Sequence, residues 1–250
     1  MEEKKLNWDK VGYHFDDSYK EVLSPFIESE EFYVIMNTLT EEAKSGKKVL
    51  PGKTEMFRIF RETKLQDIKV IFLGLSPYPQ VNLGDGLAFS CSKTMIEQPS
   101  LKILLDACED NLDLKGERNP DLQRWSSQGV FLLNLALSCR TSEPLSHVNL
   151  WKPFTKFLFT SVFNTLNVPI IYFGAEARNF MQYDNKDLHK SLAVEHPARA
   201  ARLERGLDHK GLFTFCNNFL KKQGKSEISW LEFKDLPFDM PEKKQYEEFI

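Results

Sequence analysis

The 250-residue chain fits one domain of ordinary size, and its 42% hydrophobic content is enough for a core, which excludes a disordered protein. No apolar run approaches the roughly 20 residues of a membrane helix, and the polar N-terminal residues match no secretory signal, so we expect no membrane association. The net charge of −3 does not indicate a nucleic-acid partner, although a DNA enzyme can concentrate positive charge on one face.

Short apolar runs alternate with helical patterns after a largely helical segment of about 60 residues. Each run is rich in β-branched and aromatic residues, as in strands covered on both faces. In chain order we predict a strand at 69–74, a helix at 99–112, a strand at 129–135, a helix at 151–166, strands at 169–174 and 192–195, and a helix at 211–223. This alternation predicts a three-layer α/β/α fold with a central, mainly parallel sheet of these four strands.

The domain organisation is expected to be simple. Residues 1–230 are interpreted as one domain and residues 231–250, which are acidic and aromatic, as a tail suited to a protein partner. The four cysteines are scattered, so neither a zinc site nor a disulfide framework is predicted. Their use favours an intracellular, reducing compartment, with the cytoplasm first and a nucleus or viral factory as alternatives. We expect a monomer.

In such a sheet, function gathers at the carboxyl ends of the strands. The first run is followed by GLSPYP (residues 74–79) and then by DGLAFS (residues 85–90). The second run contains Asn134, and the fourth is followed by His196. Taken one at a time, these features have ordinary explanations: a proline-rich turn, a structural asparagine bonded to backbone, and a loop histidine.

Together, the motifs G-x-x-P-Y, G-L-A-F-S, G-V-F-L-L-N and H-P, in this order, resemble the uracil-DNA glycosylase family. The resemblance runs from about Trp8 to Trp230 and includes smaller matches at 48–60, 99–101, 146–147 and 224–230. It implies base excision repair, in which uracil is flipped out of single- or double-stranded DNA and its N-glycosidic bond is cleaved. It implies DNA as the partner and no metal or organic cofactor.

The resemblance also assigns roles to residues of the pocket. Leu75 would belong to the base pocket and Phe89 would stack on uracil. Asn134 would bond the polar edge of the base with both functions of its amide. Tyr78 would stand against ring carbon 5 and exclude the methyl group of thymine. His196 would stabilise charge growing on the uracil O2.

The chain departs from the family at several positions. Ser76 stands where the family has an aspartate that positions the water and favours the cationic sugar, so slow catalysis is expected. Pro79 replaces a histidine close to the water. Serines that grip phosphates are replaced by alanines, which leaves these candidates for DNA contact: Pro99, Ser100, Arg199, Arg202 and, as a wedge in the stack, Leu203. The alternative for the arginine-rich segment is a solvated helix face.

Three functions remain open from the sequence. The first is a uracil-DNA glycosylase of low activity. The second is a glycosylase for another modified pyrimidine, although Tyr78 argues against a bulky group at carbon 5. The third is a DNA-binding or replication scaffold that keeps the fold and has lost catalysis.

Overall fold

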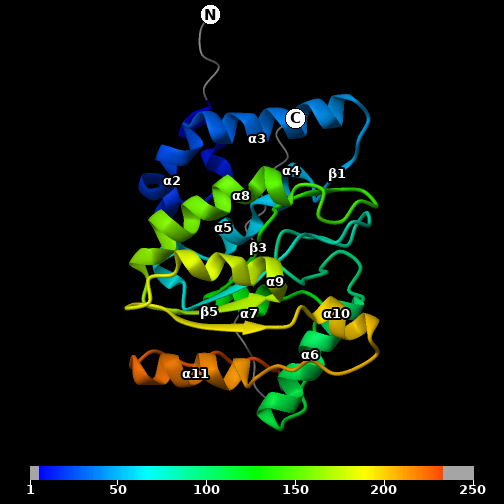
Figure 1. Ribbon diagram of the computed structural model, residues 1–250, viewed down its shortest axis with the longest axis vertical. Coiled ribbons are helices and arrows are strands. Elements are labelled where there is room, and N and C mark those ends of the chain that lie inside the picture. The colour runs from blue at the N-terminus through cyan, green and yellow to red at the C-terminus, as the bar shows by residue number, and fades with distance from the viewer. Residues whose placement is uncertain (1–5, 233–250) are drawn as a thin grey trace, which may run out of the picture.

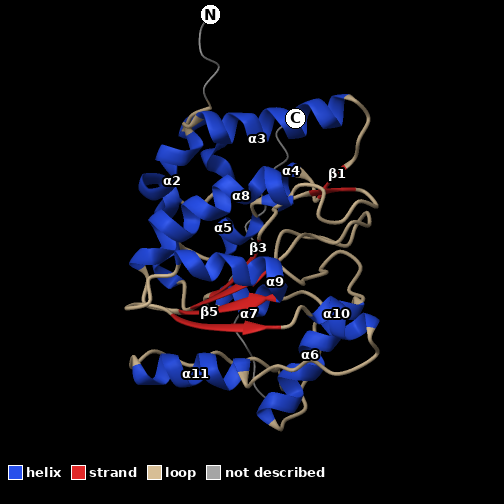
Figure 2. Cartoon of the chain, viewed as in Figure 1, coloured by secondary structure: helices blue, strands red, loops and turns tan. Residues whose placement is uncertain are grey.

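The apolar runs of the sequence form a central sheet between helical layers in the computed structural model, which describes residues 6–232 (Figure 1). Its four strands lie in the order β3-β2-β5-β6, and every neighbouring pair is parallel (Figure 2). Their bounds are Val70–Gly74 for β2, Val130–Asn134 for β3, Pro169–Phe173 for β5 and Lys190–Val194 for β6. The predicted three-layer α/β/α fold is therefore confirmed.

Strand register brings the functional segments to one edge of the sheet. Gly74 pairs with Asn134 at the ends of β2 and β3, and Phe173 pairs with Val194 at the ends of β5 and β6. Because all four strands are parallel, the residues that follow them leave the sheet on the same side. The strand predicted at 192–195 lies at the sheet edge and begins earlier, at Lys190, because an edge strand need not be apolar throughout.

Helices cover both faces of the sheet. In Figure 1, α2, α3, α5 and α8 lie over one face and α11 over the other. The helices are α1 Trp8–Val11, α2 Lys20–Ile27, α3 Glu30–Lys44, α4 Lys53–Met56, α5 Arg58–Glu62, α6 Pro99–Leu112, α7 Gln123–Ser127, α8 Val148–Phe157, α9 Gly174–Arg178, α10 Pro197–Arg202 and α11 Leu212–Lys222. The helix predicted at 99–112 has those bounds in α6, where Pro99 occupies the first turn.

Two local features differ from the sequence prediction. The helix expected over 151–166 starts at Val148, ends as an α-helix at Phe157 and continues as a π-helical turn, Leu158–Val162. The apolar spacing persists through this turn, so periodicity alone does not distinguish the wider turn from an α-helix. A small antiparallel pair, β1 (Val49–Leu50) with β4 (Cys139–Arg140), also lies outside the expected elements.

The end of the described chain packs against the core. The indole of Trp230 stacks on Phe72 with ring centroids 5.6 Å apart, and Trp125 donates its indole N–H to the carbonyl of Trp230. Leu231 is also buried, and the backbone of Glu232 forms an isolated antiparallel β-bridge with that of Glu117. Packing therefore continues past the expected boundary at residue 230, and residues 233–250 of the expected tail lie outside the described residues. Within residues 6–232, no helix combines the length and apolarity needed to cross a bilayer.

Candidate functional site

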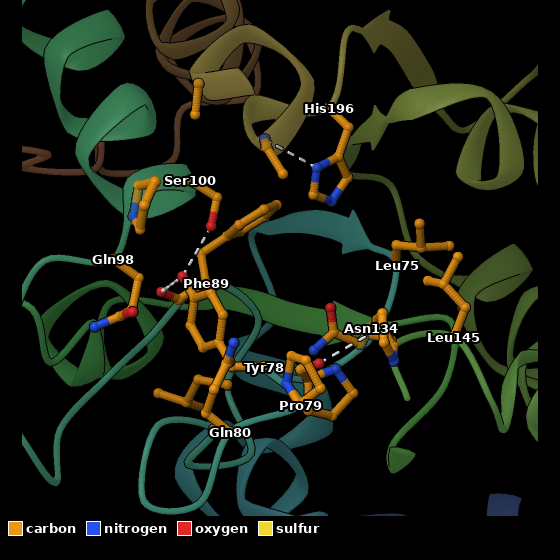
Figure 3. Close-up of a pocket in the computed structure, with 18 of the residues that line it drawn as sticks. Leu75, Tyr78, Pro79, Gln80, Phe89, Gln98, Ser100, Asn134, Leu145 and His196 are labelled. Carbon is orange, nitrogen blue, oxygen red and sulfur yellow. Dashed lines mark hydrogen bonds between the residues drawn. The ribbon is translucent and has the colours of Figure 1, made fainter. Parts of the chain in front are cut away.

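A cavity of about 600 Å³ opens where the parallel strands end (Figure 3). That volume is typical of small-molecule and cofactor sites. The cavity gathers residues from segments that are far apart in sequence. The predicted site residues that line it are Leu75, Ser76, Tyr78, Phe89, Pro99, Ser100, Asn134, His196 and Arg202. Arg199 and Leu203 are not among its lining residues.

Phe89 forms an apolar wall of the cavity in a strained backbone conformation. Its φ of 68° lies in the left-handed region, which is costly for a residue with a bulky side chain. The ring packs edge-on against Phe173 with centroids 5.0 Å apart, and its centroid lies 5.6 Å from that of His196. The tertiary contacts therefore hold an aromatic face in the cavity at the expense of local backbone energy.

Gly74, which the sequence analysis includes only as part of a motif, shapes the floor of the cavity. A Cβ at this position would lie 2.6 Å from the Asn134 Oδ1 and 3.4 Å from the Phe89 ring. The first approach is closer than real Cβ contacts, whereas the second is at the edge of ordinary van der Waals contact. The glycine at the end of β2 therefore leaves room for the Asn134 amide in its observed position.

The Tyr78 hydroxyl is fixed at two points. It donates to the carbonyl of Phe89 over 2.9 Å, and the Ser100 Oγ lies 3.0 Å away. A phenol has one proton, so Ser100 acts as the donor in the second bond. Burial raises the pKa of the Tyr78 phenol well above its usual value, which keeps the group neutral. The ring is thus an immobile part of the cavity wall.

The Asn134 amide is the polar group of the floor. Asn134 ends β3, is 8% exposed, and makes no side-chain hydrogen bond with any residue in the range 6–232. The interpretation as a structural asparagine bonded to backbone is therefore wrong. A largely buried amide with its donor and acceptor both free toward a cavity is set up to receive a ligand that supplies the complementary pair.

His196 presents a hydrogen-bond donor to the cavity. It is the N-cap of α10, and its Nδ1 accepts a bond of 3.2 Å from the backbone N–H of Ala198. Burial, with a smaller contribution from the nearby Arg202 charge, lowers the pKa of His196 to about 4. The ring is therefore neutral at pH 7, and because Nδ1 accepts, its proton resides on Nε2. Gly174, at φ +90°, leaves room for this ring, since a Cβ there would lie 3.0 Å from the His196 Cβ.

Ser76 and Asp85 decide whether the cavity offers a free carboxylate. Among the described residues, the Ser76 hydroxyl has one weak contact, 3.4 Å to the carbonyl of Pro77. Asp85 is the sole carboxylate among the described residues that line the cavity, and it is buried. It accepts from the Ser90 hydroxyl over 2.7 Å and pairs with Arg58 over 3.1 Å. Asp85 is thus committed to holding its own loop and is not free for chemistry.

The arginines after His196 have different environments. The Arg199 Nε lies 3.3 Å from the Glu195 carboxylate, and Arg205 pairs with the same carboxylate over 2.6 Å. Arg202 lines the cavity and has no carboxylate partner in the described part of the chain. Leu203 caps the end of α10 and is exposed. The solvated-face interpretation therefore fits Arg199 and Arg205, whereas Arg202 is available to an anion.

The structure adds lining residues that the sequence reading did not assign. Pro144 and Leu145 reach the cavity from the segment between β4 and α8, and Gln98 reaches it from the start of α6. No sequence signal distinguished them, apart from their position beside the 146–147 and 99–101 matches. No group of three or more ligating side chains suited to a metal ion occurs among residues 6–232.

Comparison with known proteins finds relatives of this chain by sequence and by fold. No family model matches the chain. It is 33% identical over 225 residues to a uracil-DNA glycosylase of Fusobacterium nucleatum, covering 88% of this chain and 98% of the relative. Identity with the uracil-DNA glycosylase of Acinetobacter baylyi is 31% over 229 residues, covering 89% and 95%. The fold matches the crystal structure of mimivirus uracil-DNA glycosylase with a TM-score of 0.82 at 19% identity, covering 90% of each chain.

Proposed function

The chain belongs to the uracil-DNA glycosylase family, and we propose that it removes uracil from DNA by hydrolysing the N-glycosidic bond. One observation carries the proposal at the level of the site. Tyr78, Phe89, Asn134 and His196 come from four separate segments and line one cavity at the carboxyl ends of the strands. A base inside a duplex cannot reach such a cavity, so the nucleotide must be extruded from the stack.

Recognition of the base follows from the chemistry of the cavity wall. Uracil presents an N–H donor beside a carbonyl acceptor, and the free Asn134 amide offers the matching oxygen and N–H. Cytosine has the opposite order on this edge and leaves both pairs mismatched. Phe89 supplies an apolar face for stacking. Tyr78, held by Phe89 and Ser100, cannot move aside for a methyl group at carbon 5, which disfavours thymine.

Bond cleavage develops charge of opposite sign on the two fragments. The electron pair of the C1′–N1 bond moves to the uracil ring and its O2, while the sugar becomes cationic. The neutral His196 donates from Nε2 toward O2, and one such preorganised donor is typically worth about 3–4 kcal/mol. Water then adds to C1′, and the proton that it loses neutralises the uracil anion. Ser76 supplies a dipole near the sugar but no charge, so we propose a slow enzyme.

DNA contact is proposed for one side of the cavity opening. The N-terminus of α6 lies there with Pro99 and Ser100, and its free backbone N–H groups suit a phosphate. Ser100 uses its hydroxyl proton on Tyr78, so its contact with phosphate would come from its backbone N–H. Arg202 is the second phosphate contact, whereas Arg199 is held by Glu195 and contributes less.

An oligonucleotide assay separates the three functions. The protein is incubated with single strands carrying uracil, 5-hydroxymethyluracil or thymine, and abasic sites are revealed by alkali. We expect release of uracil alone, and its loss in Asn134→Ala. Release of the hydroxymethyl base in preference to uracil would support the second function. Tight DNA binding with no release of any base would support the scaffold. That alternative is motivated by Ser76 and by the lack of a free carboxylate among the described residues that line the cavity.

A further inference from the structure

We propose that Leu145 is a second apolar contact with DNA, one that packs against the base beside the extruded nucleotide. Leu145 lines the cavity and is 46% exposed. In Figure 3, Leu145 and Leu75 lie on the right of the view, and Gln98 and Ser100 lie on the left. The inference rests on the proposed function, because it requires DNA at this opening.

The backbone conformation of Leu145 is an unfavourable one for a leucine. Its φ is 69°, in the left-handed region that a leucine rarely adopts, and Ser142 in the same loop has φ 62°. A leucine side chain that stays exposed contributes little to the free energy of folding. Neither the side chain nor the backbone conformation of Leu145 therefore gives a stability reason for a leucine at this position. Strained residues of this kind persist where the surrounding structure holds them and where they act on a ligand.

Hydrogen bonds hold the loop of Leu145 against the rest of the cavity rim. The backbone N–H of Ser142 donates to the carbonyl of Pro79 over 2.8 Å, and Pro79 itself lines the cavity. The Ser146 Oγ accepts from the backbone N–H of Arg140 over 2.8 Å. The backbone N–H of Val148, the first residue of α8, donates to the carbonyl of Leu145 over 3.0 Å. The exposed side chain is therefore presented on a fixed support.

A buried polar chain anchors this support from below. The Nε2 of His147 lies 2.9 Å from the Glu42 carboxylate, and its Nδ1 lies 2.8 Å from the Ser138 hydroxyl. The Trp151 indole N–H donates to the same hydroxyl over 2.8 Å. Burial lowers the pKa of His147, so it stays neutral and donates to Glu42 while accepting from Ser138. Each of these polar groups has a partner, which fixes His147, two residues after Leu145.

The occupant follows from what extrusion does to DNA. A flipped nucleotide leaves a gap in the base stack, and proteins that bend or open DNA often insert apolar side chains into such gaps. Leu203, the C-cap of α10, is exposed and lies outside the cavity lining, whereas Leu145 lies on the lining itself. Leu145 therefore contacts the face of a neighbouring base, and this contact exists in duplex DNA more than in a flexible single strand.

The test compares two substitutions at this position with a matched control. Leu145→Asn removes the apolar contact and suits the left-handed backbone, while Leu145→Met keeps an apolar side chain. Leu114→Asn makes the same change at a leucine that is 51% exposed and does not line the cavity. Affinity is measured for a duplex that carries a tetrahydrofuran abasic analogue with 2-aminopurine on either side. The KM for uracil release is measured on duplex and on single-stranded substrates.

We expect Leu145→Asn to weaken duplex affinity and raise duplex KM by about tenfold, with a change within about twofold on single strands. It should also abolish the 2-aminopurine response on one side of the abasic analogue. Leu145→Met and Leu114→Asn should resemble the wild type, and the melting temperature of Leu145→Asn should be unchanged or higher. Equal effects of the two asparagine variants, or a fall of many degrees in Leu145→Asn, would overturn the proposal. If the wild type releases no uracil, the proposed function fails. The affinities of the wild type and of Leu145→Asn for the abasic duplex then still show whether Leu145 contacts DNA.

Discussion

Replacing Ser76 with aspartate tests how this site manages the cationic sugar. Ser76 lines the cavity, and within residues 6–232 its hydroxyl makes only the 3.4 Å contact with Pro77. Asp85, the sole carboxylate among the described lining residues, is occupied by Ser90 and Arg58. No free negative charge therefore faces the sugar among these residues. Ser76→Asp adds that charge at a half-buried position with room for a longer side chain.

The expected gain follows from electrostatics. A carboxylate about 4 Å from a unit positive charge is worth about 4 kcal/mol at an effective dielectric constant of about 20. Part of this is offset by desolvation of the new carboxylate and by incomplete charge on the sugar in the transition state. Loss of a single preorganised group typically costs about 10²–10³ in rate. We therefore expect Ser76→Asp to accelerate uracil release by at least about tenfold.

Single-turnover release of uracil at saturating DNA is the measurement, because it isolates the chemical step from binding and product release. Ser76→Asn is the matched control, since asparagine has the size of aspartate without its charge. The reasoning predicts acceleration by Asp and none by Asn. An unchanged or lower rate in Ser76→Asp, with DNA affinity preserved, would refute it and show that the serine belongs to a different mechanism.

The remaining predictions concern the gate, the phosphate contacts and the histidine. Tyr78→Ala should allow release of thymine, while Tyr78→Phe, which keeps the ring, should still exclude it; absence of thymine release by the alanine variant would disprove the gate. Arg202→Ala should lower the salt slope of duplex binding by about 0.7–0.9, and Arg199→Ala by less, measured by anisotropy over a range of NaCl; equal slopes would contradict the distinction drawn from Glu195. Because the pKa of His196 is about 4, the single-turnover rate should hold from pH 7 to about pH 5 and fall as the pH passes through 4, where a second proton on Nδ1 breaks the bond from the Ala198 N–H that positions the ring. Arg202→Gln should move this fall to higher pH, since the guanidinium charge contributes to the lowered pKa; a fall centred near pH 6.5 in the wild type would refute the assignment.

The sequence was sufficient for the sheet and for the main cavity residues. Continuous apolar runs indicate strands buried on both faces, and strands alternating with helices indicate parallel pairing. Parallel pairing then places the residues after Gly74, Asn134 and Val194 at one edge. The order of the motifs indicated the remaining cavity residues, because the motifs lie at or after the ends of strands. This information is local, and local patterns can be read from a sequence.

Only the tertiary structure decided which residues are free to act. Asp85 has the charge to stabilise a cationic sugar, but it is bound to Ser90 and Arg58. Arg199 has the charge to bind a phosphate, but it is paired with Glu195. Leu145 carries no local signal, and it matters because of its backbone conformation and its place on the rim. The hydrogen-bond partners of a residue, its degree of burial and its φ angle all depend on segments that are distant in the sequence. Long-range packing fixes these properties, and a one-dimensional pattern does not record them.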